Sequence, residues 1–178
     1  MRRVCAVMMV AAISSPAAAD DNIAANRMGY IARHRCAVVE RLEALHRRRP
    51  GGGALNRFII LRLRGEPQRY VQCMFDNLRD TRMICEASSG TYGPTGQSPL
   101  RLGASDRAAL HALGYVQASA RENFARPVEL GDPPDLTIAA DLMLATLYDG
   151  YGARPGRVIE VSSSHGDDPA VPCGTPTS

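Results

Sequence analysis

The segment before residue 50 predicts one amphipathic helix. Apolar side chains in Asp21–His46 recur at steps of three and four, which is the spacing of one helix face. The stripe consists of Met28, Ile31, Val38, Leu42 and Leu45, with Cys36 on its flank. The run from Arg47 to Gly53 holds a proline and three glycines, which cannot continue a helix. We therefore expect a helix over Asp21–His46 that buries one side.

Three short segments then alternate between apolar and polar side chains, as half-buried strands do. They are Arg57–Arg64, Arg69–Asp76 and Arg82–Ser88, separated by turns at Gly65–Gln68 and Asn77–Thr81. The apolar side chains that share a face are Ile59, Leu61, Leu63, Val71, Cys73, Phe75, Met83, Cys85 and Ala87. An antiparallel meander with one apolar face needs a helix to cover that face.

A loop and two short elements follow the meander. Ser89–Leu102 is rich in glycine, proline, serine and threonine, which predicts an irregular connection. Ser105 and Asp106 are capping residues for a short helix that ends near Leu113. A short strand is expected near Val128.

The last part of the chain predicts a second long helix and a closing strand. Asp132–Asp135 has the sequence Asp-Pro-Pro-Asp, which starts a helix, and Gly150 and Gly152 end it. Its apolar stripe is Leu136, Ala139, Ala140, Met143, Leu144 and Leu147. Arg157–Val161 forms the closing strand. The whole pattern predicts an α+β fold in which an antiparallel meander sheet packs against a long N-terminal helix and a long C-terminal helix.

The N-terminus has the three parts of a secretory signal peptide. Two arginines precede the uncharged apolar segment Val4–Ile13, and Ser14–Pro16 interrupts its helix. Ala17–Ala19 supplies the small residues that a signal peptidase requires before Asp20. The apolar run is far shorter than the ~20 residues that span a bilayer. We expect cleavage near Ala19, a periplasmic or secreted protein, and no membrane span after cleavage.

The remaining chain has the size of one domain and an uneven charge. We expect a single domain over residues 20–161 and a flexible tail over 162–178. All 21 basic residues are arginine. Residues 20–69 carry 11 arginines and 5 acidic side chains, whereas residues 70–178 carry 8 arginines and 13 acidic side chains. The two parts can neutralise each other within the fold or in a head-to-tail dimer, or the basic helix can meet an anionic partner.

Four cysteines follow the predicted cleavage site, and an even number in an oxidising compartment predicts two disulfides. With the second hairpin centred near Arg79, Cys73 and Cys85 lie opposite each other on the buried face, at a distance that a disulfide can bridge. Pairing of Cys36 with Cys173 then follows by elimination. The alternatives are a helix-to-sheet bridge from Cys36 to Cys73 or Cys85, and two buried free thiols.

The chain lacks the residue patterns of common catalytic and metal sites. Its four histidines are dispersed, and no His-Glu-x-x-His, Gly-x-Ser-x-Gly or Cys-x-x-Cys sequence occurs. They are His34, His46, His111 and His165. Tryptophan is absent and aromatic content is low, so the chain has no evident stacking platform for nucleic acid. We expect no catalytic residues, no cofactor, no metal and no nucleic-acid partner.

Three short motifs lie in order in the second half of the chain. Leu113-Gly114-Tyr115 follows an alanine- and leucine-rich helix, Asn123-Phe124 is followed by Arg126, and Leu142–Gly152, with Leu147–Gly152 at its end, forms the end of the last helix. Together with the order of elements over residues 36–161, these motifs resemble the YbjN-like and TY-Chap families, which are α/β domains similar to type III secretion chaperones. The resemblance implies binding of a protein client or dimerisation, and it supplies no catalytic residues.

These observations predict an exported, disulfide-bonded, non-catalytic protein-binding or chaperone-like factor. Its partner is a protein client or a second copy of the chain. The alternative is a periplasmic inhibitor of an envelope enzyme that presents the Ser89–Leu102 loop, since a restrained loop binds at a lower entropic cost. An unrecognised hydrolase is the third possibility, and a hydrolytic screen with each histidine replaced would distinguish it.

Overall fold

The computed structural model describes residues 16–48, 57–76, 79–92 and 99–164. In chain order its elements are α1 (Pro16–His46), β1 (Phe58–Leu63), β2 (Glu66–Asp76), β3 (Arg79–Ala87), α2 (Ala104–Ala112), β4 (Phe124–Glu129), α3 (Leu136–Ala145), the π-helical turn η2 (Thr146–Gly150) and β5 (Ile159–Ser163). The fold class is α+β, as the sequence predicts.

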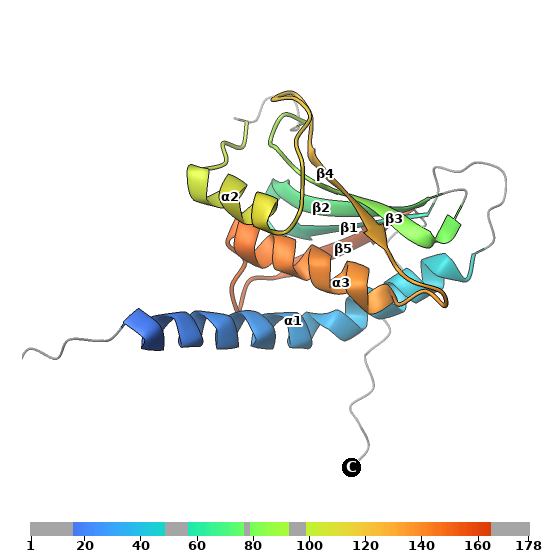
Figure 1. Ribbon diagram of the computed structural model, residues 1–178, viewed down its shortest axis with the longest axis horizontal. Coiled ribbons are helices and arrows are strands. Elements are labelled where there is room, and N and C mark those ends of the chain that lie inside the picture. The colour runs from blue at the N-terminus through green and yellow to red at the C-terminus, as the bar shows by residue number, and fades with distance from the viewer. Residues whose placement is uncertain (1–15, 49–56, 77–78, 93–98, 165–178) are drawn as a thin grey trace, which may run out of the picture.

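The five strands form one antiparallel sheet in the order β4-β3-β2-β1-β5. The predicted meander is its centre, and β4 and β5 extend it on the two sides. β4 contains Val128, where the sequence predicts a short strand. β5 closes the sheet beside β1, so segments far apart in the chain are neighbours (Figure 1).

The first hairpin turn is tighter than the sequence predicts. Residues 65–68 were the expected turn, but Glu66 already pairs with Leu63 and belongs to β2. The turn therefore consists of Arg64 and Gly65, with Gly65 at φ 79°. The second residue of this turn takes a positive φ, which glycine adopts without steric cost.

One face of the sheet is buried under the helices, and we call it the covered face. Ile59, Leu61, Val71, Cys73 and Phe75 are 0% exposed there, as are Met83, Cys85 and Ala87. Figure 1 shows α1 and α3 side by side beneath the strands, and these two helices contact each other extensively. The alternation in the three central strands therefore identified the covered face correctly.

α1 differs from the expected helix at its N-terminal end. It begins at Pro16, where the sequence predicts a helix break, because proline fits the first turn of a helix. The predicted signal cleavage site thus lies within α1, and residues 1–15 are outside the described residues. Ile31, Val38, Leu42 and Leu45 are buried as predicted.

Met28 was assigned to the buried stripe of α1, and that assignment is wrong. Its side chain is 65% exposed, whereas Tyr30 is buried in its place at 1%. Tyr30 packs against Tyr148 of η2, so α3 and η2 determine which side of this end of α1 is buried.

α3 begins where the sequence predicts. Asp135 is its N-cap and accepts hydrogen bonds from the Thr137 backbone N–H at 2.9 Å and from the Thr137 hydroxyl at 2.6 Å. Every residue of the predicted apolar stripe is buried. The α-helix ends at Ala145 and continues as η2 to Gly150, so the predicted single helix is a helix of 10 residues followed by a π-helical turn of 5.

The folded domain reaches further than the predicted boundary at residue 161. Ser162 and Ser163 belong to β5 and pair with Ile60 and Ile59 of β1. Residues 165–178, which hold the rest of the predicted flexible tail, lie outside the described residues. Within the described ranges, no helix has the length and apolar character to cross a membrane.

Candidate functional site

The predicted disulfide between Cys73 and Cys85 is present. The two residues are direct partners in the β2–β3 register, and their sulfur atoms are 2.03 Å apart. Both side chains are 0% exposed on the covered face. The bond therefore ties β2 to β3 beneath the helices and takes no part in a surface site.

The second predicted disulfide stays a prediction. Cys36 lies on the exposed side of α1 and is disulfide-bonded. Cys173 lies outside the described residues. The helix-to-sheet alternatives are wrong, because Cys73 and Cys85 bind each other.

Two of the family-motif segments meet at the edge of the sheet. The Arg126 guanidinium of β4 donates a hydrogen bond to the Leu113 carbonyl, and Val116 pairs with Ala125. Gly114 has φ 83°, and a Cβ atom at this position would lie 3.3 Å from Arg126 Nε. The positive φ at 114 therefore favours glycine, and a larger side chain would also require a small shift of the Arg126 side chain.

Tyr115 and Phe124 of these motifs are core residues. Each is 1% exposed, and the Tyr115 hydroxyl lies 3.0 Å from Thr146 Oγ1 in η2. Burial raises the pKa of Tyr115 to about 12. These two positions are part of the hydrophobic core and stabilise the fold.

The Asn123 side chain connects three segments of the chain. Its side-chain NH2 donates to the Tyr70 hydroxyl at 3.1 Å, and its carbonyl oxygen accepts from the Ser89 backbone N–H at 3.1 Å. It thereby connects the segment before β4 to β2 and to the start of the 89–102 loop. Four of the six motif residues line surface pockets: Asn123 lines the pocket beside Tyr70 and Glu86, Phe124 lines the pocket at the 89–102 loop, and Leu113 and Arg126 line the groove between α1, α3 and β4.

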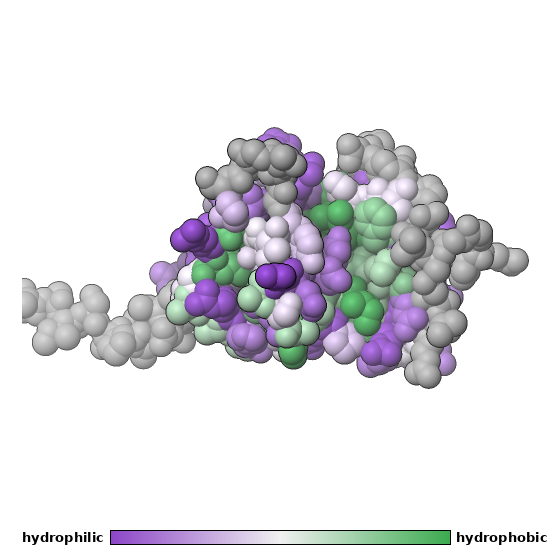
Figure 2. Space-filling model, turned by 90° about the horizontal axis from the view of Figure 1, so that it is seen from above, coloured by the Kyte–Doolittle hydropathy of each residue, from purple (hydrophilic) through white to green (hydrophobic). Residues whose placement is uncertain are grey.

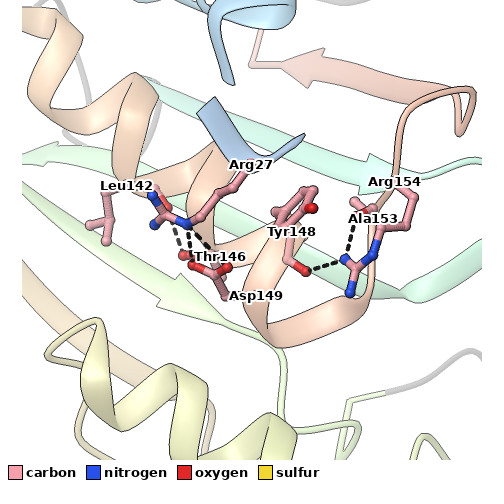
Figure 3. A network of polar contacts seen from close by, with 7 residues as sticks. All are labelled: Arg27, Leu142, Thr146, Tyr148, Asp149, Ala153 and Arg154. Carbon is pink, nitrogen blue, oxygen red and sulfur yellow. Dashed lines mark hydrogen bonds and ion pairs between the residues drawn. The ribbon is translucent and has the colours of Figure 1, made fainter. Parts of the chain in front are cut away.

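The third motif segment, η2, is fixed by a network of polar contacts (Figure 3). Arg27 of α1 donates to both carboxylate oxygens of Asp149, at 3.1 and 2.8 Å. Arg154 donates to the Tyr148 carbonyl at 2.9 Å, and its guanidinium lies 4.4 Å from the centre of the Tyr148 ring. Arg27 therefore joins α1 to η2, whereas Arg154 fixes the segment that follows η2 against it.

The opposite face of the sheet carries apolar side chains that remain partly exposed, and we call it the open face. Phe58, Met74, Ile84 and Pro127 are successive register partners across β1, β2, β3 and β4, so they form one row. Directly paired residues of antiparallel strands point to the same face. Figure 2 shows hydrophobic side chains gathered in one patch over the strands, next to the more polar α2 region.

A cavity lies within this row, and we call it the open-face cavity. It has a volume of about 240 Å³ and is lined by Phe58, Ile60, Gln72, Met74, Ile84 and Glu86. Four of the six lining side chains are apolar. The cavity is thus a mainly apolar recess on the open face.

A second, polar pocket adjoins it, and we call it the tyrosine–glutamate pocket. It measures about 500 Å³ and is lined by Tyr70, Gln72, Glu86, Tyr92, Glu122, Asn123 and Ala125. It shares Gln72 and Glu86 with the open-face cavity, and the Gln72 amide donates to Glu86 at 2.8 Å. The two recesses are therefore neighbouring parts of one surface.

The remaining charges of the open face form pairs at its margins. Arg62 donates to Glu160 at 2.7 Å, and Arg64 donates to the same carboxylate at 3.2 Å. Arg82 lies 3.3 Å from Glu129 at the other end. These ion pairs therefore lie at the margins of the apolar row.

Two other pockets are less suited to a ligand. A groove of about 540 Å³ between α1, α3 and β4 exposes Met28 and Ile138, but its arginines Arg27 and Arg35 are already paired with Asp149 and Asp141. A pocket of about 600 Å³ is lined by residues at both ends of the 89–102 loop, and residues 93–98 of that loop are outside the described residues.

The histidines do not form a shared site in the described part of the chain. His34 packs on Tyr30, His46 lies against Phe75, and His111 Nδ1 is 3.0 Å from the Tyr115 carbonyl. In the same ranges, no three His, Cys, Asp or Glu side chains gather closely enough to hold a metal ion. His165 and the carboxylates beside it lie outside the described residues.

The apolar side chains of the open face were not predicted. The strand Arg57–Arg64 was interpreted from Ile59, Leu61 and Leu63, with arginines on the other side. Phe58 and Ile60 occupy that other side too, so residues 58–61 form a continuous apolar run. Such a run signals a strand with apolar side chains on both faces, and this signal was available in the sequence.

No protein-family model matches this chain, and neither a curated protein nor a solved structure matches it.

Proposed function

We propose that this chain is an exported, non-catalytic protein-binding or chaperone-like factor that holds its partner on the open face. The observation that carries the proposal is the partly exposed apolar row Phe58–Met74–Ile84–Pro127, with a cavity in its centre. Apolar side chains gathered on one accessible surface mark a site of protein interaction.

The helical layer supports this proposal because it fixes the sheet from behind. The disulfide between Cys73 and Cys85 joins β2 to β3 on the covered face. The ion pair between Arg27 and Asp149 joins α1 to η2 in the helical layer behind these strands. A rigid strand surface loses little conformational entropy when a partner binds. In our proposal, the N-terminal helix and the C-terminal α3–η2 segment serve as that backing.

Export is part of the proposal. The predicted signal peptide supports it, and the disulfide suits an oxidising compartment. The resemblance to YbjN-like and TY-Chap domains supports a role in binding proteins. We propose the periplasm or the medium as the location.

Photo-crosslinking from two matched methionines tests the function. Met74 lies on the open face, whereas Met28 is exposed in the groove between α1, α3 and β4, outside the open face. A photoreactive amino acid is introduced at either position in the full chain, which is expressed in cells and irradiated. We expect protein adducts from position 74 and none of the same mass from position 28.

Reconstitution completes this test. The crosslinked protein is purified and its affinity for the full chain is measured by calorimetry with Met74→Asp and Met28→Asp. Met74→Asp should abolish binding and Met28→Asp should leave it unchanged. Equal adducts from both positions, or equal binding by both variants, would contradict the proposal.

The inhibitor alternative is favoured by one feature, which is the anchoring of the loop ends. Ser89 N–H donates to Asn123 Oδ1 at 3.1 Å, and Leu100 N–H donates to Gln68 Oε1 at 2.5 Å. Both ends of the 89–102 loop are thus attached to the domain. Replacing residues 93–98 with glycine and serine would abolish binding by an inhibitor loop, but would leave open-face binding unchanged.

A further inference from the structure

The tyrosine–glutamate pocket offers negative charge and aromatic faces to a ligand. Two carboxylates, Glu86 and Glu122, line it together with Tyr70 and Tyr92, and Tyr92 is 60% exposed. Its lining contains no arginine. Carboxylates pair with cations, and tyrosine rings attract cations to their faces.

One basic side chain that lies beside the pocket in the strand register is already paired. Arg62 is the register partner of Tyr70, but its guanidinium binds Glu160 at 2.7 Å. Glu86 accepts one hydrogen bond from the Gln72 amide, and a carboxylate has further acceptor sites. The pocket therefore complements a cationic side chain from outside the domain.

The two recesses follow each other along the strands. The open-face cavity is centred near Met74 and Ile84, and the tyrosine–glutamate pocket begins at the next residues on this face, Gln72 and Glu86. Residues two positions apart in a strand are roughly 6.8 Å apart. The same spacing separates alternate side chains of an extended partner that lies parallel to β2.

We propose that the open face recognises an extended protein segment that carries an apolar side chain and, two residues away, an arginine or lysine. The apolar side chain enters the open-face cavity, and the cation enters the tyrosine–glutamate pocket between Glu86, Glu122 and the two tyrosines. This inference rests on the proposed function and adds the chemistry of the partner.

A phage-displayed library of random heptapeptides, panned on the immobilised full chain, tests the inference. We expect selected peptides to carry Arg or Lys two positions from Leu, Ile, Met, Val or Phe, enriched roughly tenfold over the input library. Panning on a Glu86→Gln/Glu122→Gln double variant should lose the basic preference and keep the apolar one. Glutamine at 86 retains an oxygen that accepts from Gln72, so this variant preserves the local hydrogen bond.

A second variant separates this inference from the proposed function. Panning on Met74→Ser/Ile84→Ser should enrich no sequence pattern, because the apolar recess is lost. Circular dichroism and the mass of the oxidised chain verify that each variant is folded. Apolar peptides without a basic preference on the unchanged chain would overturn the inference and leave the proposed function standing. Failure of the unchanged chain to select any pattern would overturn both.

Two further measurements test what binds in the tyrosine–glutamate pocket. A synthetic peptide with the selected sequence should bind at least fivefold more weakly when its basic residue is replaced by citrulline, which removes the charge. Sedimentation is measured for the unchanged chain alone and for the Glu86→Gln/Glu122→Gln variant alone. We expect no dimer of the unchanged chain that is lost in the variant. Such a dimer would assign the pocket to a second copy of the chain and overturn the proposal of an external segment.

Discussion

The two faces of the same sheet carry apolar side chains for different purposes. On the covered face, Leu61 and Phe75 are 0% exposed beneath the helices. On the open face, their chain neighbours Ile60 and Met74 are partly exposed and line a cavity of about 240 Å³. Since these residues alternate along the same strands, one position along the chain separates a structural role from a candidate binding role.

Polar groups also differ between the two faces. The covered side includes a few buried polar groups with close partners, such as the Thr146 hydroxyl, which donates to the Leu142 carbonyl at 2.7 Å. The open face holds carboxylates at its surface, where water and a ligand can reach them. Buried polar groups need a partner within the fold, so groups available to a ligand are expected on the open face.

The largest expected effect comes from adjacent residues on opposite faces. Leu61→Ala should lower the free energy of unfolding by about 2–5 kcal/mol, because it leaves a cavity in the core. Ile60→Ala should lower it by only about 1 kcal/mol, because that side chain is partly exposed. Urea unfolding of both variants measures the difference. Equal losses would show that the two faces are equally buried.

The disulfide gives the next largest effect on the covered face. Replacing both Cys73 and Cys85 with alanine should lower the free energy of unfolding by about 2–4 kcal/mol, since the bond restricts the unfolded chain across 12 positions. Both sulfurs are buried, so reductant should act slowly on the folded chain and rapidly in urea. Rapid reduction without denaturant would contradict the burial of this bond.

A single buried hydroxyl gives a smaller effect. Tyr115→Phe removes the hydrogen bond between Tyr115 and Thr146 and should lower the free energy of unfolding by about 1 kcal/mol. Thr146 keeps its own bond to Leu142, which limits the cost. Tyr92→Phe, on the open face, is the matched control and should leave the melting temperature unchanged.

The smallest effect is expected from an ion pair at the margin of the open face. The hydrogen bond from Arg62 lowers the pKa of Glu160 below its ordinary value of 4.5. The contribution of this ion pair to the free energy of unfolding is therefore present above pH 4.5 and is lost as the pH falls through the lowered pKa of Glu160. Glu160→Gln should melt slightly below the unchanged chain at pH 7, and the two melting curves should converge near pH 2. A difference that persists at low pH would exclude this carboxylate as its cause.

Much of the covered face was predictable because burial follows the local period of the sequence. The alternation at Val71, Cys73 and Phe75 gave both the buried side and the disulfide register. The stripe of α3 and its Asp135 cap were equally local. Met28 was mispredicted because a helical stripe in sequence leaves open which neighbour covers each end of the helix.

The candidate site was less predictable because it is assembled from distant segments. Tyr70 and Gln72 come from β2, Glu86 from β3, and Glu122 and Asn123 from the segment before β4. The hairpin register that places Cys73 opposite Cys85 also places Gln72 opposite Glu86, but no spacing in the chain brings Glu122 or Asn123 to them. The apolar run at residues 58–61 was a local signal of the open face, and it was overlooked.

The sequence by itself determined the α+β class, the covered face and the Cys73–Cys85 pairing, because strand parity and helix period are properties of neighbouring residues. The tertiary structure alone decided that β4 and β5 flank the meander. It also decided that Glu86 and Glu122 share a pocket, because strand order and loop placement depend on contacts between segments far apart in the chain.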